Sequence, residues 1–169
     1  MMATMINESW YTSNKDYWET PNNLFNQLNK EFDFTLDAAA SDHNAKVDKY
    51  FTETDNALIQ DWEGRVFVNP PYGRELRHWV EKAASESEKD YNEVVVMVIP
   101  ARPDTSYWHD FIFDKAAEIR FIRGRLKFEI LGEPNDPAPF PSAIVIFKKN
   151  HGGTVVKPMI QDKPKSDKE

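Results

Sequence analysis

A short apolar segment that runs directly into two prolines constrains the fold of this chain more than any other feature. Residues 65–75 read RVFVNPPYGRE, and residues 65–68 have the character of a half-buried or buried strand. Proline lacks the N–H that a sheet ladder needs, so Pro70 and Pro71 must lie just beyond the end of this strand. Asn69 is therefore expected at the rim of a sheet, in an extended conformation because it precedes a proline.

Two interpretations of this rim fit the residues. Asparagine, proline and glycine are ordinary turn residues, so the segment can be a surface turn that only connects two elements. Alternatively, the prolines hold the Asn69 amide and the Pro70 carbonyl as a fixed polar surface beside the ring of Tyr72. The second interpretation predicts a binding site at the end of this strand.

Composition predicts one globular domain over residues 1–150, followed by a polar and partly disordered tail over 151–169. The 169 residues are 40% hydrophobic and 13% aromatic, which is enough for a single sizeable core. There is no cysteine and the four histidines lie far apart, so we expect neither disulfides nor a metal centre. A cytoplasmic protein without a membrane span is expected.

Strands alternate with amphipathic helices along the chain, which predicts an α/β fold. Thr20 should cap a helix that has Pro21 at its first position and ends near Phe32. The run EVVVMVIP is typical of a strand buried on both faces of a parallel sheet. We expect a mostly parallel sheet with an antiparallel edge, with further strands at 34–37, 118–122, 125–130 and 142–147.

Polar residues lie at, or just after, the ends of three of the predicted strands. They are Asp37, Asn69 and Arg102. Ligands of open α/β sheets bind beyond the carboxyl ends of the strands, so these residues predict a site there. Asp37 can instead cap the turn AAAS that follows it, and Asp61, shortly before the strand at 65–68, can be a turn acid beside a packing Trp62.

The net charge of −7 opposes indiscriminate binding to nucleic acid. A local basic face is still possible, because four cations fall within the short run IRFIRGRLKF and a fifth follows another strand. These five residues either share one rim, where they would contact DNA phosphates, or are separate solvated strand edges. They are Arg102, Arg120, Arg123, Arg125 and Lys127.

The sequence resembles the bacteriophage-type DNA N-6-adenine methyltransferase (Dam) family of S-adenosylmethionine-dependent amino-methyltransferases. The resemblance is carried in order by TPNNLFNQL, FTLDAAAS, DWEGRVFVNPPYG, VIPARPDTSYWH, GRLKF and PFPSAIVIF. It implies a class I methyltransferase-like (Rossmann-like) fold, S-adenosylmethionine as cofactor, and methylation of the exocyclic amine of adenine in double-stranded DNA. The protein would then act in the cytoplasm of a bacterial host.

By this resemblance, NPPY is the catalytic motif. The Asn69 side-chain oxygen and the Pro70 carbonyl would accept the two amine protons, held in place by Pro71. Tyr72 would stack on the target base after it is flipped out of the duplex.

The resemblance also implies a set of cofactor residues. Asp37 would meet the methionine part of the donor, with Thr20 and Pro21 near it, and Asp61 and Trp62 would flank its adenine ring; Asn69 would lie beside the donor as well. The usual glycine-rich turn is replaced by AAAS, and the short distance from Asp37 to the next strand predicts an abbreviated sheet. Asp55 is the candidate for the ribose.

Two alternatives remain at this point. Two acceptors fit any planar NH2 group, so the same chemistry can act on RNA or on a protein glutamine. A catalytically inactive DNA-binding protein of the same fold is the second alternative, although such a protein has no need for both NPPY and Asp37.

Overall fold

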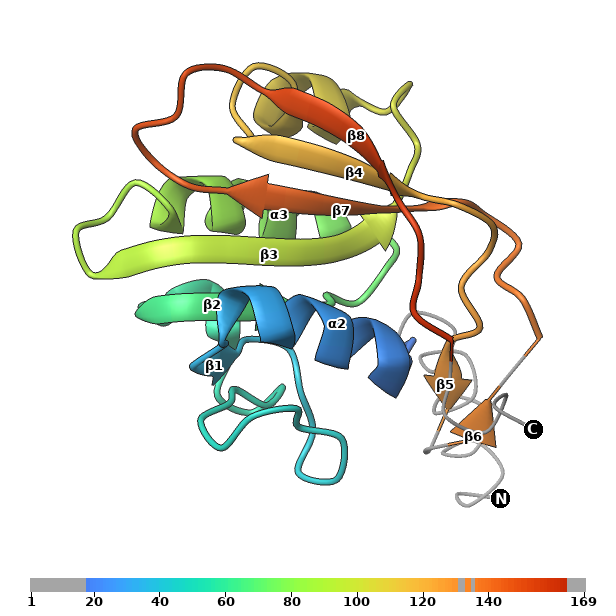
Figure 1. Cartoon of the computed structure of the whole chain (residues 1–169). Coiled ribbons are helices and arrows are strands. Elements are labelled where there is room, and N and C mark those ends of the chain that lie inside the picture. Colours follow the sequence, from blue (N-terminus) through green and yellow to red (C-terminus); the bar gives the residue numbers. More distant parts are fainter. Residues whose placement is uncertain (1–17, 131–132, 135, 164–169) are drawn as a thin grey trace.

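The computed structural model describes residues 18–163 except for 131, 132 and 135, and a six-stranded sheet lies at its centre (Figure 1). The strand order is β1-β2-β3-β7-β4-β8. Strands β1, β2 and β3 are parallel neighbours, β8 is parallel to β4, and β7 runs antiparallel between β3 and β4. The predicted mostly parallel α/β sheet is confirmed. Its strands are β1 (Leu36–Asp37), β2 (Gly64–Val68), β3 (Asn92–Pro100), β4 (Glu118–Ile122), β7 (Ser142–Phe147) and β8 (Val155–Met159).

Helices cover both faces of this sheet (Figure 1). Helix α2 (Asn22–Phe32) lies on one face, and helix α3 (Leu76–Glu86) and the short helix η2 (Trp108–Ile112) lie on the other. Burial on both faces explains why β3 and β7 are apolar runs without alternation, and all six residues of β7 are buried.

Helix α2 begins one residue later than predicted. Pro21 occupies the N-cap position with an extended backbone, and its carbonyl accepts a hydrogen bond from the N–H of Phe25 at 3.0 Å. Thr20 therefore lies outside the helix, and no side chain caps it. The Thr20 hydroxyl is thus not used as a helix cap.

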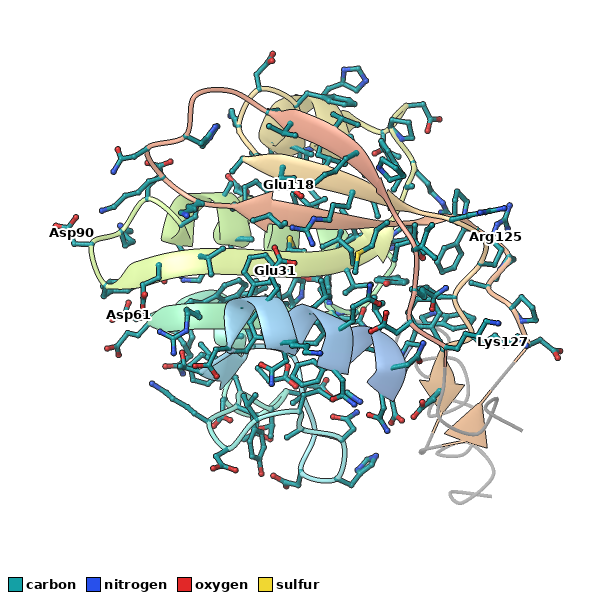
Figure 2. The ribbon with its side chains drawn as sticks, viewed as in Figure 1. Glu31, Asp61, Asp90, Glu118, Arg125 and Lys127 are labelled. Atoms are coloured by element: carbon teal, nitrogen blue, oxygen red, sulfur yellow. The ribbon has the colours of Figure 1, made fainter. Side chains whose placement is uncertain are left out.

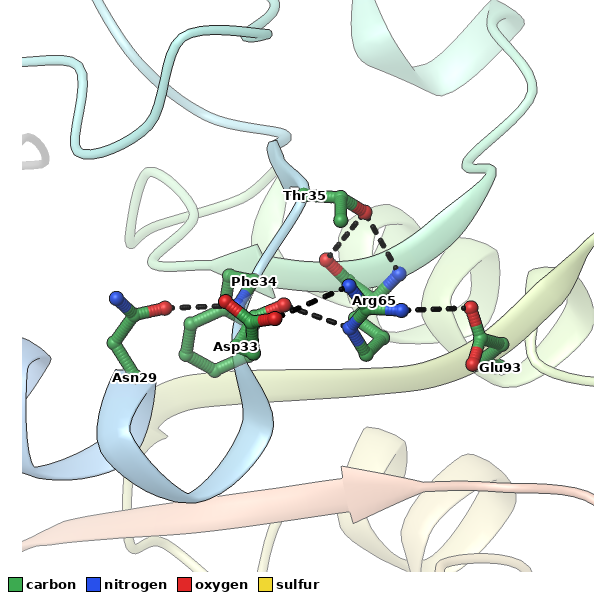
Figure 3. Close-up of polar contacts among 6 residues, drawn as sticks. All are labelled: Asn29, Asp33, Phe34, Thr35, Arg65 and Glu93. Carbon is green, nitrogen blue, oxygen red and sulfur yellow. Dashed lines mark hydrogen bonds and ion pairs between the residues drawn. The ribbon is translucent and has the colours of Figure 1, made fainter.

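A polar network ties the amino ends of the central strands to the end of α2 (Figure 3). Arg65 donates from Nε to the Asp33 carbonyl at 2.7 Å and from Nη1 to Glu93 at 3.0 Å. The Thr35 hydroxyl oxygen accepts a hydrogen bond from the Arg65 N–H at 3.0 Å. Asn29 Oδ1 accepts one from the Phe34 N–H at 2.8 Å. This network fixes the strand register at the amino ends of β2 and β3. The site lies at the opposite, carboxyl ends of the strands.

Two expectations about the C-terminal half are corrected. The strand predicted at 125–130 is only β5 (Glu129–Ile130), which pairs with β6 (Glu133–Pro134) outside the main sheet. The predicted tail contains β8, and the following residues are held on α2, because Gln27 bonds to Ile160 and Asp162. Residues 1–17 and 164–169 lie outside the described residues, so the disorder expected in the last part of the tail stays a prediction.

Candidate active site

A cavity of about 570 Å³ lies at the carboxyl edge of β1 and β2. Its walls come from residues 18–20, from the loop 37–46, from 51–58 and from the start of the segment after β2. The structure brings Thr20, Asp37, Asn69 and Pro71 together in this cavity. Pro70 is buried next to it, and Pro21 is buried at the start of α2 and is not part of the lining.

The Asn69 amide is fixed in one orientation. Its Nδ2 donates to the backbone carbonyl of Trp18 and, at 2.9 Å, to the hydroxyl of Thr20. A carbonyl can only accept, so the nitrogen end must face Trp18. The other end, Oδ1, is buried and has no hydrogen-bond partner among the described residues. An unpaired buried acceptor costs about 1–3 kcal/mol, which marks this oxygen as a position for a donor from a ligand.

Asp37 is almost fully buried and holds the loop that follows it. Its Oδ1 accepts from the Ala39 N–H at 3.3 Å and its Oδ2 from the Lys46 N–H at 3.0 Å. Burial raises the pKa of Asp37 to about 6, against the effect of these two hydrogen bonds. The predicted turn-capping role of Asp37 is therefore present, and the same carboxylate also lines the cavity.

Lys46 is a cavity residue that no sequence pattern indicated, because it lies in a polar segment without periodicity. Its Nζ donates to Asn22 Oδ1 at 2.7 Å. Burial lowers the pKa of Lys46, while the carboxylates of Glu129, Asp37 and Glu19 oppose that shift. The cavity therefore contains an acid and a base carried by the same loop.

The residues predicted to flank the donor's adenine ring are not in the cavity. Trp62 is fully buried, its N–H donates to Glu86 at 2.6 Å, and its indole N–H donates to the Ala57 carbonyl at 2.9 Å. Asp61 accepts from the Tyr91 hydroxyl, and Figure 2 shows Asp61 on the side of the sheet away from Arg125 and Lys127. Asp61 and Trp62 both lie at the amino end of β2 and do not line the cavity, so the structure gives no support to their assignment to the cofactor.

The cavity wall on this side is formed by the segment 52–58 and not by Asp61 or Trp62. Asn56 has a left-handed backbone with φ of 54°, and its side chain accepts from the Leu58 N–H at 3.3 Å, which shapes the short helix η1 (Ala57–Ile59). Trp62 supports Ala57 from behind through its indole N–H. Asp55, the candidate for the ribose, accepts from Thr52 in a turn and does not line the cavity.

Tyr72 cannot stack on a base in this conformation. Only 7% of the residue is exposed, and its hydroxyl donates to the Val98 carbonyl at 3.1 Å. Its ring packs edge-on against Phe140 and Phe128 at centroid distances of 5.7 and 6.1 Å. The stacking role predicted for Tyr72 is therefore corrected. Trp18 is partly exposed and lines the cavity beside Asn69.

One of the five basic residues differs from the other four in its exposure. Arg120 is buried and forms a two-pronged ion pair with Glu31 at 2.8 and 2.7 Å, and also bonds Glu118, so it is not available for DNA. The remaining four are exposed, and Figure 2 shows two of them on the side of the molecule where β3 ends. These four are Arg102, Arg123, Arg125 and Lys127.

Within the part of the chain that the structure describes, no group of histidine, cysteine or acidic side chains is arranged to hold a metal ion. None of the helices described there is long and apolar enough to cross a membrane.

Sequence comparisons identify the family and relatives of this chain. The family model described as DNA N-6-adenine-methyltransferase (Dam) matches residues 8–166. The chain belongs to this family. A DNA N-6-adenine-methyltransferase of Haemophilus phage HP1 (strain HP1c1) is 36% identical over 142 residues, which is 80% of either chain. One of Escherichia phage T1 is 33% identical over 121 residues, 70% of this chain and 49% of the relative.

A shorter match links the chain to a bacterial protein. The putative methyltransferase YfdM of Escherichia coli (strain K12) is 43% identical over 65 residues, 34% of this chain and 71% of the relative. Membership of the Dam family confirms the predicted activity, methylation of the N-6 amine of adenine in DNA. It does not favour an RNA or protein substrate or an inactive DNA-binding protein.

Proposed function

We propose that this Dam-family enzyme transfers a methyl group from S-adenosylmethionine to adenine in double-stranded DNA, with Asn69 Oδ1 accepting a proton of the target amine. The observation that carries this proposal is the buried and unpartnered Oδ1 of Asn69 at the cavity.

The acceptor is needed because the adenine amine is a weak nucleophile, whose lone pair is delocalised into the ring. A hydrogen bond from the amine to Asn69 Oδ1 favours the tetrahedral nitrogen on which the lone pair is localised. The Pro70 carbonyl is the second acceptor in this proposal. Both dipoles are held before the reaction by the proline-restricted backbone, so they need no reorganisation as positive charge develops on the nitrogen.

The residues of the cavity fit a methyl donor of this class. The volume of about 570 Å³ lies within the range of small-molecule sites. Asp37 would hold the donor's ammonium group, Lys46 its carboxylate, and the wall 52–58 its adenine ring. S-adenosylmethionine supplies a methyl group activated by a sulfonium, which requires alignment with the amine more than a strong base.

DNA would approach across the exposed basic residues at the carboxyl edge, since the rest of the acidic surface repels phosphates. The target adenine must leave the base stack to reach the cavity, as in other enzymes that react with a base. Arg102 lies with its guanidinium 5.4 Å from the Phe140 ring, next to the aromatic cluster around Tyr72. A phage-type enzyme of this kind would work in the cytoplasm of the bacterial host.

The direct test is incubation of the protein with unmethylated duplex DNA and S-adenosylmethionine labelled in its methyl group, followed by nucleoside analysis. We expect labelled N6-methyladenine. Parallel reactions contain single-stranded RNA and a glutamine-containing protein extract. Label in either of these, with none in DNA, would contradict the proposal.

A further inference from the structure

The geometry points to Thr20 as a positioning residue for Asn69. We propose that the Thr20 hydroxyl and the Trp18 carbonyl form an amide clamp, which holds the Asn69 side chain with its oxygen toward the target base. This inference rests on the proposed role of Asn69. It gives Thr20 a task different from the cofactor contact that the family resemblance implied.

The clamp is needed because the two ends of an asparagine amide have almost the same shape. A rotation of the amide group by half a turn exchanges oxygen and nitrogen. In that rotated state an N–H of Asn69 would face an N–H of the target amine, and no hydrogen bond would form. Only the orientation seen in the structure leaves an acceptor for the substrate.

Both hydrogens of the Asn69 NH2 group are used by the clamp. One is directed to the Trp18 carbonyl and the other to Thr20 Oγ1 at 2.9 Å. The Trp18 carbonyl selects the nitrogen end, since it cannot donate, and Thr20 adds the second contact that prevents the amide from tilting. Removing the Thr20 hydroxyl would leave one buried N–H unpaired and the amide held at a single point.

The clamp itself is held in place by a distant segment. Glu19, between the two clamp residues, pairs with Glu129 through two backbone hydrogen bonds of 3.0 and 2.9 Å. The Trp18 ring packs edge-on against Phe128 and Phe140 at 5.5 and 5.9 Å. Thr20 is 2% exposed and does not cap α2. Its buried hydroxyl is thus committed to Asn69 by a rigid backbone.

The experiment is a double-mutant cycle between Thr20 and Asn69. Thr20→Val keeps the shape of the side chain but removes the hydroxyl, and Thr20→Ser keeps the hydroxyl. We expect Thr20→Val to lower kcat by about tenfold or more, since small misplacement of a reacting group has a large effect on rate. Thr20→Ser should stay within about threefold of the unmodified enzyme. The donor dissociation constant, from calorimetry, should not change in either variant.

The Asn69→Ala background separates the clamp from other roles. There, Thr20→Val should have no further effect on the single-turnover rate, because no amide remains to be oriented. An equal fold-loss in both backgrounds would overturn the proposal. A weaker donor affinity with unchanged kcat would also overturn it, and would return Thr20 to the cofactor.

A readout that does not depend on activity distinguishes failure of the clamp from failure of the proposed function. The side-chain NH2 protons of Asn69 can be followed by NMR hydrogen exchange. They should exchange faster in Thr20→Val than in Thr20→Ser or the unmodified protein, whether or not DNA is methylated. Equal exchange in all three proteins would rule out the clamp, whereas absence of N6-methyladenine in the unmodified enzyme would count against the proposed function alone.

Discussion

The backbone N–H of Lys46 donates to the carboxylate of Asp37 at 3.0 Å, so the loop that carries a half-buried cation is folded around a buried acid. The bond uses the backbone of Lys46 and not its side chain, and both residues line the cavity. This arrangement offers opposite charges to the two ends of an amino acid, so binding of the proposed donor here would be sensitive to pH.

Donor affinity should rise with pH through about 6 and level off above 7. Burial raises the pKa of Asp37 to about 6, and a donor ammonium group binds the ionised carboxylate. Below pH 6 the affinity should therefore fall by up to about tenfold per pH unit. Calorimetry between pH 5 and 8 measures this. Asp37→Ala should bind weakly at every pH with a flat profile, while His43→Gln, which alters another side chain of the cavity, should keep the unmodified profile.

The stability of the donor-free protein should show the opposite trend. A raised pKa means that the folded state holds the Asp37 proton more tightly than the unfolded state. The free energy of unfolding gains from this below pH 4 and loses the gain as pH rises through about 6, by about 3 kcal/mol at most. Denaturant unfolding should show this loss in the unmodified protein but not in Asp37→Ala. The same pH dependence in both proteins would contradict the assignment of this stability loss to Asp37.

Asn69→Ala should lower turnover by about 10²–10³-fold, the effect of losing one preorganised transition-state partner. Donor affinity should be retained. Asn69→Asp should also be slow, because its second carboxylate oxygen would face the Trp18 carbonyl in place of Nδ2. Single-turnover kinetics, corrected for the folded fraction, is the measurement. A near-normal rate for Asn69→Ala would leave the segment after β2 as a simple turn.

Tyr72→Phe should reduce stability slightly and leave the rate per folded molecule nearly unchanged. The lost hydrogen bond to the Val98 carbonyl contributes about 0.5–1.5 kcal/mol. Tyr72→Ala should cost about 3–5 kcal/mol, because it leaves a cavity between Phe128 and Phe140. Thermal unfolding and assays on the folded fraction separate these effects. A loss of DNA affinity in Tyr72→Phe without a loss of stability would restore a direct role for this residue.

Two neighbouring residues of η1 test which wall holds the donor. Leu58 lines the cavity, whereas Ile59 is 75% exposed and does not. Leu58→Ala should weaken donor binding by about 5- to 30-fold through the loss of apolar contact. Ile59→Ala and Asp61→Asn should bind the donor normally. If Asp61→Asn is the variant that loses affinity, the donor lies elsewhere.

The basic residues should divide into two classes. Replacing Arg123 and Arg125 together by alanine should preserve the melting temperature and reduce the salt slope of DNA binding by about 2, one per lost phosphate contact. Arg120→Ala should instead lower the free energy of unfolding by about 1–3 kcal/mol, because it removes the ion pair with Glu31. It should leave DNA affinity unchanged. Filter binding at several salt concentrations tests both. An unchanged slope in the double variant would move the DNA surface elsewhere.

The features predicted correctly from the sequence depend on local signals. The prolines after Asn69 end β2 wherever that strand lies, and the apolar run of β3 requires cover on both faces. Because β1 and β2 are parallel neighbours, Asp37 and Asn69 reach the same cavity without further information.

The misplaced residues depend on contacts between distant segments, for which the sequence carries no local signal. Tyr72 is buried by Phe128 and Phe140, and Arg120 is neutralised by Glu31 from the helix layer. In the sequence, Trp62 is an aromatic residue next to an acid, and no local pattern shows that its ring is buried. The ring is buried because the preceding segment folds against it, with Ala57 accepting from its indole N–H. The proposed role of Thr20 could not be predicted from the sequence, because a threonine directly before Pro21 is also typical of a helix cap.

The position of β7 has a consequence for how this protein is made. This strand follows β4 in the chain but lies between β3 and β4, where all of its residues are buried. Until Phe147 has left the ribosome, β3 and β4 each present an open, apolar edge with nothing to pair with, and such edges associate with one another. β3 and β4 therefore cannot be joined into one sheet until β7 has been made, and β8 completes the sheet afterwards by pairing with the other edge of β4.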